Sequence, residues 1–207
     1  MKRSATKHDR WEDHYARLAK KHGFPARSIF KLREIQRKYH LIQKGDKVLD
    51  LGCSPGSWLL YAADLTGQRG RVVGVDLKPV TIGLPPHATV YSGDVLSIDE
   101  TLLGKMGKGF NVLLSDMAPA TTGNKQVDTA RSYHLCLGAL DLGRRLLKPG
   151  GSFVCKIFQG EDIEEFTDSV AKTFKQHKIF KPQSSRKASK EIYIIGLGKK
   201  EPKSSEI

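Results

Sequence analysis

Two charged residues occupy positions where a charge is costly unless it meets a partner. Asp116 directly follows the apolar run FNVLLS (110–115), and Lys156 lies inside the apolar run GSFVCKIF (151–158). Both runs are typical of buried strands, so each charged side chain must reach a partner or a crevice. A carboxylate beside an amine can orient a nucleophile and remove its proton. The alternative is that Lys156 extends its amine from a strand end into solvent.

A glycine turn and two acidic residues suggest a ligand pocket. The run KVLDL (47–51) leads into the turn GCSPGSW (52–58), which lacks the GxGxxG spacing that a dinucleotide pyrophosphate favours. Asp76 ends the next apolar run, where a carboxylate can accept hydrogen bonds from the ribose hydroxyls of an adenosine. Asp94 follows the third run and could accept from an adenine amine, although an aspartate there is also a common helix cap. These residues favour S-adenosylmethionine over NAD or a nucleotide, and the expected cofactor set is Gly52, Ser54, Pro55, Gly56, Trp58, Asp76, Leu77, Asp94, Val95 and Asp116.

The elements that must position these residues alternate along the chain. Such alternation predicts an α/β fold with a Rossmann-like, mostly parallel seven-stranded sheet and helices on both faces. The connection between the last two strands is too short for a helical crossover, so we expect the last strand to run antiparallel. Ligands bind outside the carboxyl ends of such strands, so Asp116 should face the same crevice as Gly56 and Asp76. Strands are expected at 47–51, 71–75, 88–92, 110–115, 151–158, 177–182 and 191–197, and helices at 11–22, 28–39, 57–65, 129–147 and 161–176.

Charge is concentrated at the two ends of the 207-residue chain. Residues 1–47 carry a net charge of +9, residues 48–176 of −1 and residues 177–207 of +5. A nearly neutral middle with basic flanks indicates a catalytic core that engages a polyanion such as RNA or DNA. Charge for solubility, or for an anionic membrane surface, is the alternative explanation.

Several classes of protein fit the composition poorly. No apolar run approaches the roughly 20 residues that would cross a bilayer, and the first residues do not form a secretory signal, so we expect a soluble intracellular protein. The cysteines (Cys53, Cys136 and Cys155) show no metal-ligand spacing, and their odd number argues against a disulfide framework. We therefore expect neither a metal site nor disulfides.

The motifs together resemble the FtsJ/RrmJ family of 2′-O-ribose methyltransferases, from about Trp11 to Leu197. The family more often has APGGW where this chain has SPGSW, and often has Asn at the position of Ala120. Both differences are small substitutions on loops. The matching segments are RSIFKLREIQ (27–36), VLDLGCSPGSW (48–58), VDLKP (75–79), GDV (93–95), SDMAPATTG (115–123), GGSFVCKIFQG (150–160) and RKASKEIYIIG (186–196).

The resemblance implies a class I methyltransferase that uses S-adenosylmethionine to methylate a ribose 2′-hydroxyl of RNA. Its catalytic tetrad falls on Lys31, Asp116, Lys156 and Glu191. Lys156 would act as the base, and an amine accepts a proton only in its uncharged form. The charge of Lys31 favours that form while the carboxylate of Asp116 opposes it, and the sequence leaves this balance open. Glu191 would hold Lys31 or the sugar.

The resemblance also implies a structured RNA as partner, most directly a uridine of large-subunit (23S) ribosomal RNA. A tRNA or mRNA-cap methyltransferase, an RNA-binding ribosome assembly factor and, more remotely, an NAD-linked oxidoreductase remain alternatives. We expect a cytoplasmic monomer with a basic helical extension at 1–46, a methyltransferase domain at 47–198 and a flexible tail at 199–207. The expected RNA-binding residues are Arg17, Lys20, Lys21, Arg27, Arg33, Arg37, Lys38, Arg186, Lys187 and Lys190.

Overall fold

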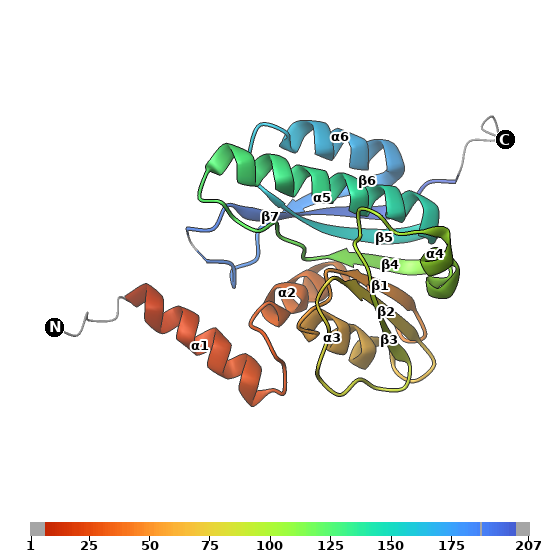
Figure 1. Ribbon diagram of the computed structural model, residues 1–207, viewed down its shortest axis with the longest axis horizontal. Helices are drawn as coiled ribbons and strands as arrows, with labels where there is room; N and C mark the ends of the chain where they lie inside the picture. Colours follow the sequence, from red (N-terminus) through yellow and green to blue (C-terminus); the bar gives the residue numbers. More distant parts are fainter. Residues whose placement is uncertain (1–6, 187, 202–207) are drawn as a thin grey trace.

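The computed structural model describes residues 7–186 and 188–201 and contains one seven-stranded sheet (Figure 1). The strand order is β3-β2-β1-β4-β5-β7-β6, and β7 runs antiparallel to both of its neighbours. The predicted architecture is thereby confirmed, including the direction of the last strand. The strands are β1 (Lys47–Leu51), β2 (Arg71–Asp76), β3 (Ala88–Ser92), β4 (Phe110–Ser115), β5 (Leu147–Phe158), β6 (Phe174–Phe180) and β7 (Glu191–Lys199).

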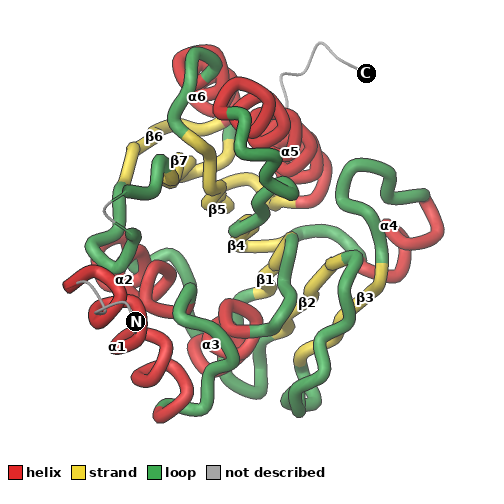
Figure 2. Tube along the Cα trace, turned by 60° about the vertical axis from the view of Figure 1, so that its left-hand side comes forward, coloured by secondary structure: helices red, strands yellow, loops and turns green. Residues whose placement is uncertain are grey.

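Helices cover both faces of the sheet (Figure 2). Alternate strand residues point to opposite faces, so Leu49 and Leu51 pack with α4, α5 and α6, while Val48 packs with α2 and α3. Each face therefore has its own apolar layer, with the buried strands between them. The helices are α1 (Lys7–Lys21), α2 (Ile29–Tyr39), α3 (Ser57–Thr66), α4 (Glu100–Met106), α5 (Lys125–Leu146) and α6 (Ile163–Thr173).

Helix α2 is part of the core. Its Leu32 and Ile35 are buried in the same cluster as Trp58, and the Gln36 amide closes the turn to β1 through hydrogen bonds with the backbone of Ile42. Helix α1 contacts the rest through a smaller cluster that includes Ala19. A division of the chain at residue 46 stays a prediction.

Several element boundaries differ from the sequence-based ones. Helix α5 begins at Lys125, four residues before the predicted start, because the Asn124 side chain accepts hydrogen bonds from the amides of Gln126 and Val127. Helix α4 was missed. It has only seven residues, and the Asp99 side chain caps it by accepting from the Leu102 amide.

The C-terminal strands also begin and end elsewhere than predicted. Helix α6 ends at Thr173 rather than 176, because buried Phe174 begins β6 and stacks on Phe153 of β5. Strand β5 begins at Leu147, before the predicted 151. Strand β7 ends at Lys199, whose amine donates to the carbonyl of Leu147, so the strand includes the first residue of the predicted tail. The last residues of that tail, 202–207, lie outside the described residues.

None of the helices in the described ranges is long and apolar enough to cross a membrane.

Candidate active site

A cleft of about 490 Å³ opens at the carboxyl ends of the central strands. It brings together seven residues of the expected cofactor set: Gly52, Ser54, Asp76, Leu77, Asp94, Val95 and Asp116. It also contains residues that sequence reasoning did not select, namely Lys78, Gly93, Met117, Ala118, Pro119, Ala120 and Leu135. Apolar residues such as Met117 carry no chemical signal in the sequence, and only the fold brings them to the cleft.

The glycine turn is shaped by close approaches. Gly52 has φ of +74°, and a Cβ there would collide with the Met117 side chain. Gly56 has φ of +112°, and its Cβ would lie 2.5 Å from Cδ1 of Ile82. Both positions therefore require glycine for conformation and for space.

Asp76 links the glycine turn after β1 to the segment after β2. Its Oδ2 accepts a hydrogen bond of 2.9 Å from the Ser54 amide, and its Oδ1 accepts one of 2.8 Å from the Lys78 amide. Asp94 accepts a bond of 2.9 Å from the Leu96 amide. With Asp116, the cleft contains three carboxylates and no phosphate-binding glycine pattern, which suits an adenosine that carries a positive sulfonium.

Three expected cofactor residues lie away from the cleft lining: Pro55, Gly56 and Trp58. The indole of Trp58 is buried, donates to the carbonyl of Ser28 and stacks on the ring of Tyr193 with centroids 5.8 Å apart. The structure therefore places Trp58 behind the predicted catalytic residues, where it supports Tyr193.

Lys156 and Asp116 form one half of the predicted tetrad. The Lys156 amine lies 3.1 Å from Oδ1 of Asp116 and donates a bond of 2.6 Å to the Asp116 carbonyl. Its side chain is only 7% exposed, so the amine ends at the Asp116 carboxylate and not in solvent. The alternative of a lysine that extends into water does not describe this residue.

Lys31 and Glu191 form the other half, with Nζ and Oε1 2.6 Å apart. Tyr193 lies between the two pairs: its hydroxyl donates to Oδ1 of Asp116 at 2.6 Å, and its ring centroid is 6.0 Å from the Lys31 amine. Sequence reasoning missed Tyr193. Its position two residues after Glu191 in a strand was the available signal, because such residues share a face.

The charges of the tetrad set the ionisation of its buried members. Burial alone would raise the pKa of Asp116, but the charges of Lys156 and Lys31, with hydrogen bonds from Tyr193 and Lys156, outweigh it and lower the pKa. Burial, followed by the nearby carboxylates of Asp116 and Glu191, raises the pKa of Tyr193 well above its usual value. Asp116 is therefore a carboxylate at neutral pH, and Tyr193 remains a hydroxyl donor.

Asp50 is a further buried carboxyl group behind the cleft. Its pKa is raised well above the ordinary value, first by burial and then by the charges of Asp116 and Asp76. Its Oδ2 has no hydrogen-bond partner among the described residues. Burial without a cation favours the protonated acid.

The expected RNA-binding residues differ in how far their side chains are exposed. Arg27 donates a bond of 2.9 Å to the Ser184 carbonyl, and Arg33 lies 5.2 Å from the ring centroid of Phe24. These two cations therefore contribute to internal contacts. Lys187 lies outside the described residues, while the exposed ones are Arg17, Lys20, Lys21, Arg37, Lys38, Arg186 and Lys190.

The fold and the cleft define a methyltransferase of the Rossmann-like class, and comparisons with known proteins agree. The model of the FtsJ-like methyltransferase family matches residues 24–199. A ribosomal RNA large subunit methyltransferase E of Desulforapulum autotrophicum is 54% identical over 96% of this chain and 98% of its own length. A protein of the same name from Bdellovibrio bacteriovorus is 48% identical over 91% and 97%.

Solved structures show the same fold. The crystal structure of a ribosomal RNA methyltransferase, described as putative, from Plasmodium falciparum has a TM-score of 0.73 at 25% identity, over 84% of this chain and 97% of its own. Fibrillarin from Aeropyrum pernix, solved with natively bound S-adenosylmethionine, has a TM-score of 0.53 at 16% identity, over 76% and 68%. This chain belongs to the FtsJ-like methyltransferase family and is an S-adenosylmethionine-dependent methyltransferase.

Proposed function

We propose that this protein methylates the 2′-hydroxyl of a uridine ribose in large-subunit ribosomal RNA. The observation that carries the proposal is the buried Lys156 amine, held by Asp116 where that residue also lines the cofactor cleft. Relatives that are 44–54% identical are named ribosomal RNA large subunit methyltransferase E, which supports ribosomal RNA as the substrate class. The basic ends of the chain support a polyanionic partner.

Lys156 can act as a general base once its amine has lost the proton that makes it the cation paired with Asp116. An uncharged amine has two N–H donors and one lone pair. The two donors match the two Asp116 oxygens that Lys156 contacts, the carbonyl at 2.6 Å and Oδ1 at 3.1 Å. The lone pair then remains to accept the proton of a ribose hydroxyl as that oxygen becomes the nucleophile.

The cofactor residues have a separate task. Asp76, Asp94 and Gly52 would hold S-adenosylmethionine, which supplies the methyl group when bound. Because Asp116 contacts Lys156 and also lines this cleft, it aligns the base with the bound donor. Glu191 compensates the charge of Lys31, so we assign this pair to holding the sugar.

The proposal includes a cytoplasmic monomer that acts on structured ribosomal RNA or on the large subunit. The test incubates the protein and S-adenosylmethionine with large ribosomal subunits, free ribosomal RNA, tRNA or capped mRNA, each from cells that lack the modification. We expect S-adenosylhomocysteine to form with a large-subunit substrate, and mass mapping to find one 2′-O-methyluridine. Product with tRNA or capped mRNA alone, or a methylated base in place of ribose, would overturn the proposal.

A further inference from the structure

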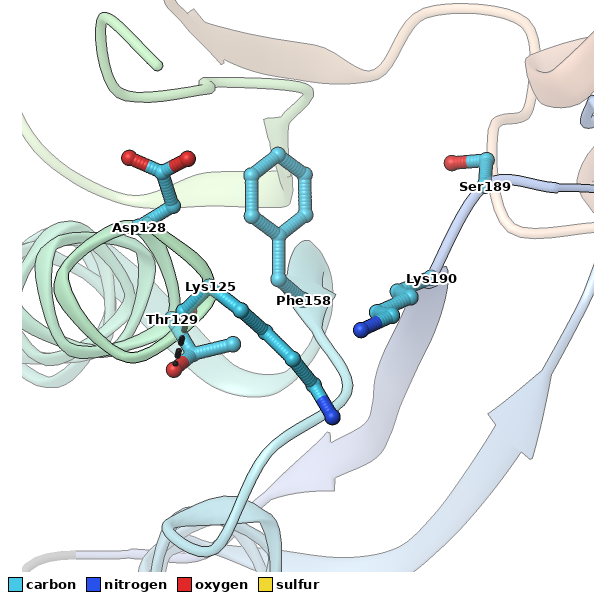
Figure 3. A pocket seen from close by; sticks show the side chains of 6 residues that line it. All are labelled: Lys125, Asp128, Thr129, Phe158, Ser189 and Lys190. Atoms are coloured by element: carbon cyan, nitrogen blue, oxygen red, sulfur yellow. Dashed lines mark hydrogen bonds between the residues drawn. The ribbon is translucent and has the colours of Figure 1, made fainter. Parts of the chain in front are cut away.

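A second pocket lies outside the cofactor cleft, between the start of α5 and the segment that leads into β7. It has a volume of about 230 Å³ and is lined by Lys125, Asp128, Thr129, Phe158, Ser189 and Lys190 (Figure 3). None of these residues lines the cofactor cleft. Lys125 and Phe158 also lie outside the sets that the sequence selected.

The pocket borders the catalytic residues. Phe158 is the direct partner of Glu191 in the ladder between β5 and β7, just as Lys156 is the partner of Tyr193. Phe158 and Lys156 therefore lie on one face of β5, about 7 Å apart along the strand. A polymer with its reacting group at Lys156 would place a neighbouring unit near Phe158.

Two cations converge in this pocket. The side chains of Lys125 and Lys190 extend toward each other in Figure 3. The close approach of the Lys125 amine, followed by burial, lowers the pKa of Lys190. Two ammonium groups at close range repel each other, and an anion between them would remove that repulsion.

The acidic residue of the pocket does not supply the anion. Asp128 accepts hydrogen bonds from the amide and hydroxyl of Thr122 at 2.8 and 2.9 Å, and from the amide of Gly123 at 3.3 Å. Its carboxylate points away from both amines in Figure 3. Among the described residues, neither lysine forms an ion pair with a carboxylate.

The backbone at both lysines is held by secondary structure or by hydrogen bonds. Lys125 is the first residue of α5, directly after the Asn124 cap. The carbonyl of Lys190 accepts a hydrogen bond of 2.9 Å from the Gln159 amide, and the Ser189 hydroxyl accepts one from the Glu191 amide. The segment before β7 is also held against α2, because Glu34 accepts hydrogen bonds from the amides of Gln183 and Ser184 (Figure 2).

We infer that this pocket binds the nucleotide next to the one that is methylated, with its phosphate between Lys125 and Lys190 and its base against Phe158. Paired ammonium groups bind a phosphodiester, and an aromatic ring offers a base a stacking surface of any sequence. The inference rests on the proposed function, because it takes RNA as the ligand. It adds a positioning site that fixes which ribose reaches Lys156.

The phosphate is tested by salt dependence. The variant with Lys125→Ala and Lys190→Ala and a control with Lys148→Ala and Lys172→Ala are titrated with the methylatable RNA over a series of salt concentrations. Lys148 lies at the amino end of β5 and Lys172 in the last turn of α6, and both are exposed, so the control removes equal charge. We expect the slope of log affinity against log salt to fall by about 1 in the pocket variant alone, as for one lost phosphate contact. Equal slopes for the two variants would overturn the phosphate site.

The base is tested with Phe158→Leu, which keeps an apolar side chain and removes the ring. We expect affinity for intact RNA to fall about fivefold or more. RNA that lacks the base of one neighbour of the methylated nucleotide should bind both proteins equally. An effect of Phe158→Leu that persists with either neighbour abasic would overturn the base site. Methylation of RNA by the parent protein is scored separately, so failure of the pocket is distinguishable from failure of the proposed function.

Discussion

Lys156 and Tyr193 are direct partners across the antiparallel ladder of β5 and β7, and both donate hydrogen bonds to Asp116. Paired residues of such a ladder share a face, so the two donors reach one side of the sheet together. Asp116 meets them from the end of the neighbouring β4. Three strands thus fix the base, and a small shift of any one strand would misplace it.

Replacement of Lys156 with alanine tests the proposed base. We expect Lys156→Ala to bind S-adenosylmethionine and RNA nearly as the parent does, and to lose methyl transfer by roughly 10²–10⁴-fold, the usual effect of removing a general base. Single-turnover transfer with both ligands saturating isolates this step from binding.

The matched control is Lys148→Ala, which removes an exposed lysine from the other end of β5. Its transfer rate should equal that of the parent. Asp116→Ala should lose both transfer and cofactor affinity, because Asp116 contacts Lys156 and lines the cofactor cleft. Near-parental transfer by Lys156→Ala would mean that alignment alone drives the reaction.

Much of the fold could be predicted because buried elements have recognisable patterns of apolar residues in the sequence. The run that became β4 is apolar on both faces, as a strand covered by helices on both sides must be. Asp76 and Asp116 could be selected because each is a charged residue at the end of such an apolar run. Boundaries were less predictable, because a cap such as Asn124 acts through one local hydrogen-bond pattern and leaves no periodic signal.

Residues brought to the site by long-range pairing could not be predicted. Tyr193 reads in sequence as one more aromatic residue of a buried strand, and only the register against β5 brings it to Asp116. Trp58 shows the opposite case, and its place in the cofactor set stays a prediction. It stands in the cofactor motif, yet the direction of α3 carries its ring into the core against Tyr193.

The cofactor cleft is tested by Asp76→Asn. The exchange keeps one oxygen that can accept a backbone amide, replaces the other with an NH2 group that cannot, and removes the charge that would strengthen bonds to the cofactor ribose. We expect the affinity for S-adenosylmethionine to fall by roughly 1–3 kcal/mol in calorimetry. Asp64→Asn, at an exposed position on α3, serves as the control. Equal affinity of the Asp76 variant and the parent would remove Asp76 from the cofactor set.

The basic end of α1 is tested by replacing Arg17, Lys20 and Lys21 with alanine. All three are exposed near the end of the helix. We expect weaker RNA binding and a flatter salt dependence, because fewer counterions are released on binding, while cofactor affinity stays unchanged. Filter binding across a salt series measures the slope. The control replaces Lys148, Lys172 and Lys175, and the same slope in both triple variants would show that α1 does not contact phosphate.

The buried carboxyl group of Asp50 should make the free energy of unfolding depend on pH. Its pKa is raised in the folded protein, so the native state holds a proton that the unfolded state releases above about pH 4. The contribution of Asp50 to stability is therefore complete below that pH and is lost as pH rises toward the folded pKa, at about 1.4 kcal/mol per pH unit. Asp116, whose pKa is lowered, has the opposite sign: its contribution is present above about pH 4 and is lost on acidification.

The variant Asp50→Asn separates the pH dependence due to Asp50 from that due to Asp116. An amide resembles the protonated acid and does not titrate, so only the contribution of Asp50 is removed. Relative to the parent, we expect the free energy of unfolding of the variant to increase as pH rises from about 5. Denaturant unfolding at several pH values measures this difference, and the histidines cancel because both proteins contain them. If the amide forms a poorer hydrogen bond than the acid, the free energy of unfolding of the variant falls by the same amount at every pH. The change of the difference with pH is then unaffected. If the difference does not change with pH, Asp50 does not hold a proton in the folded protein.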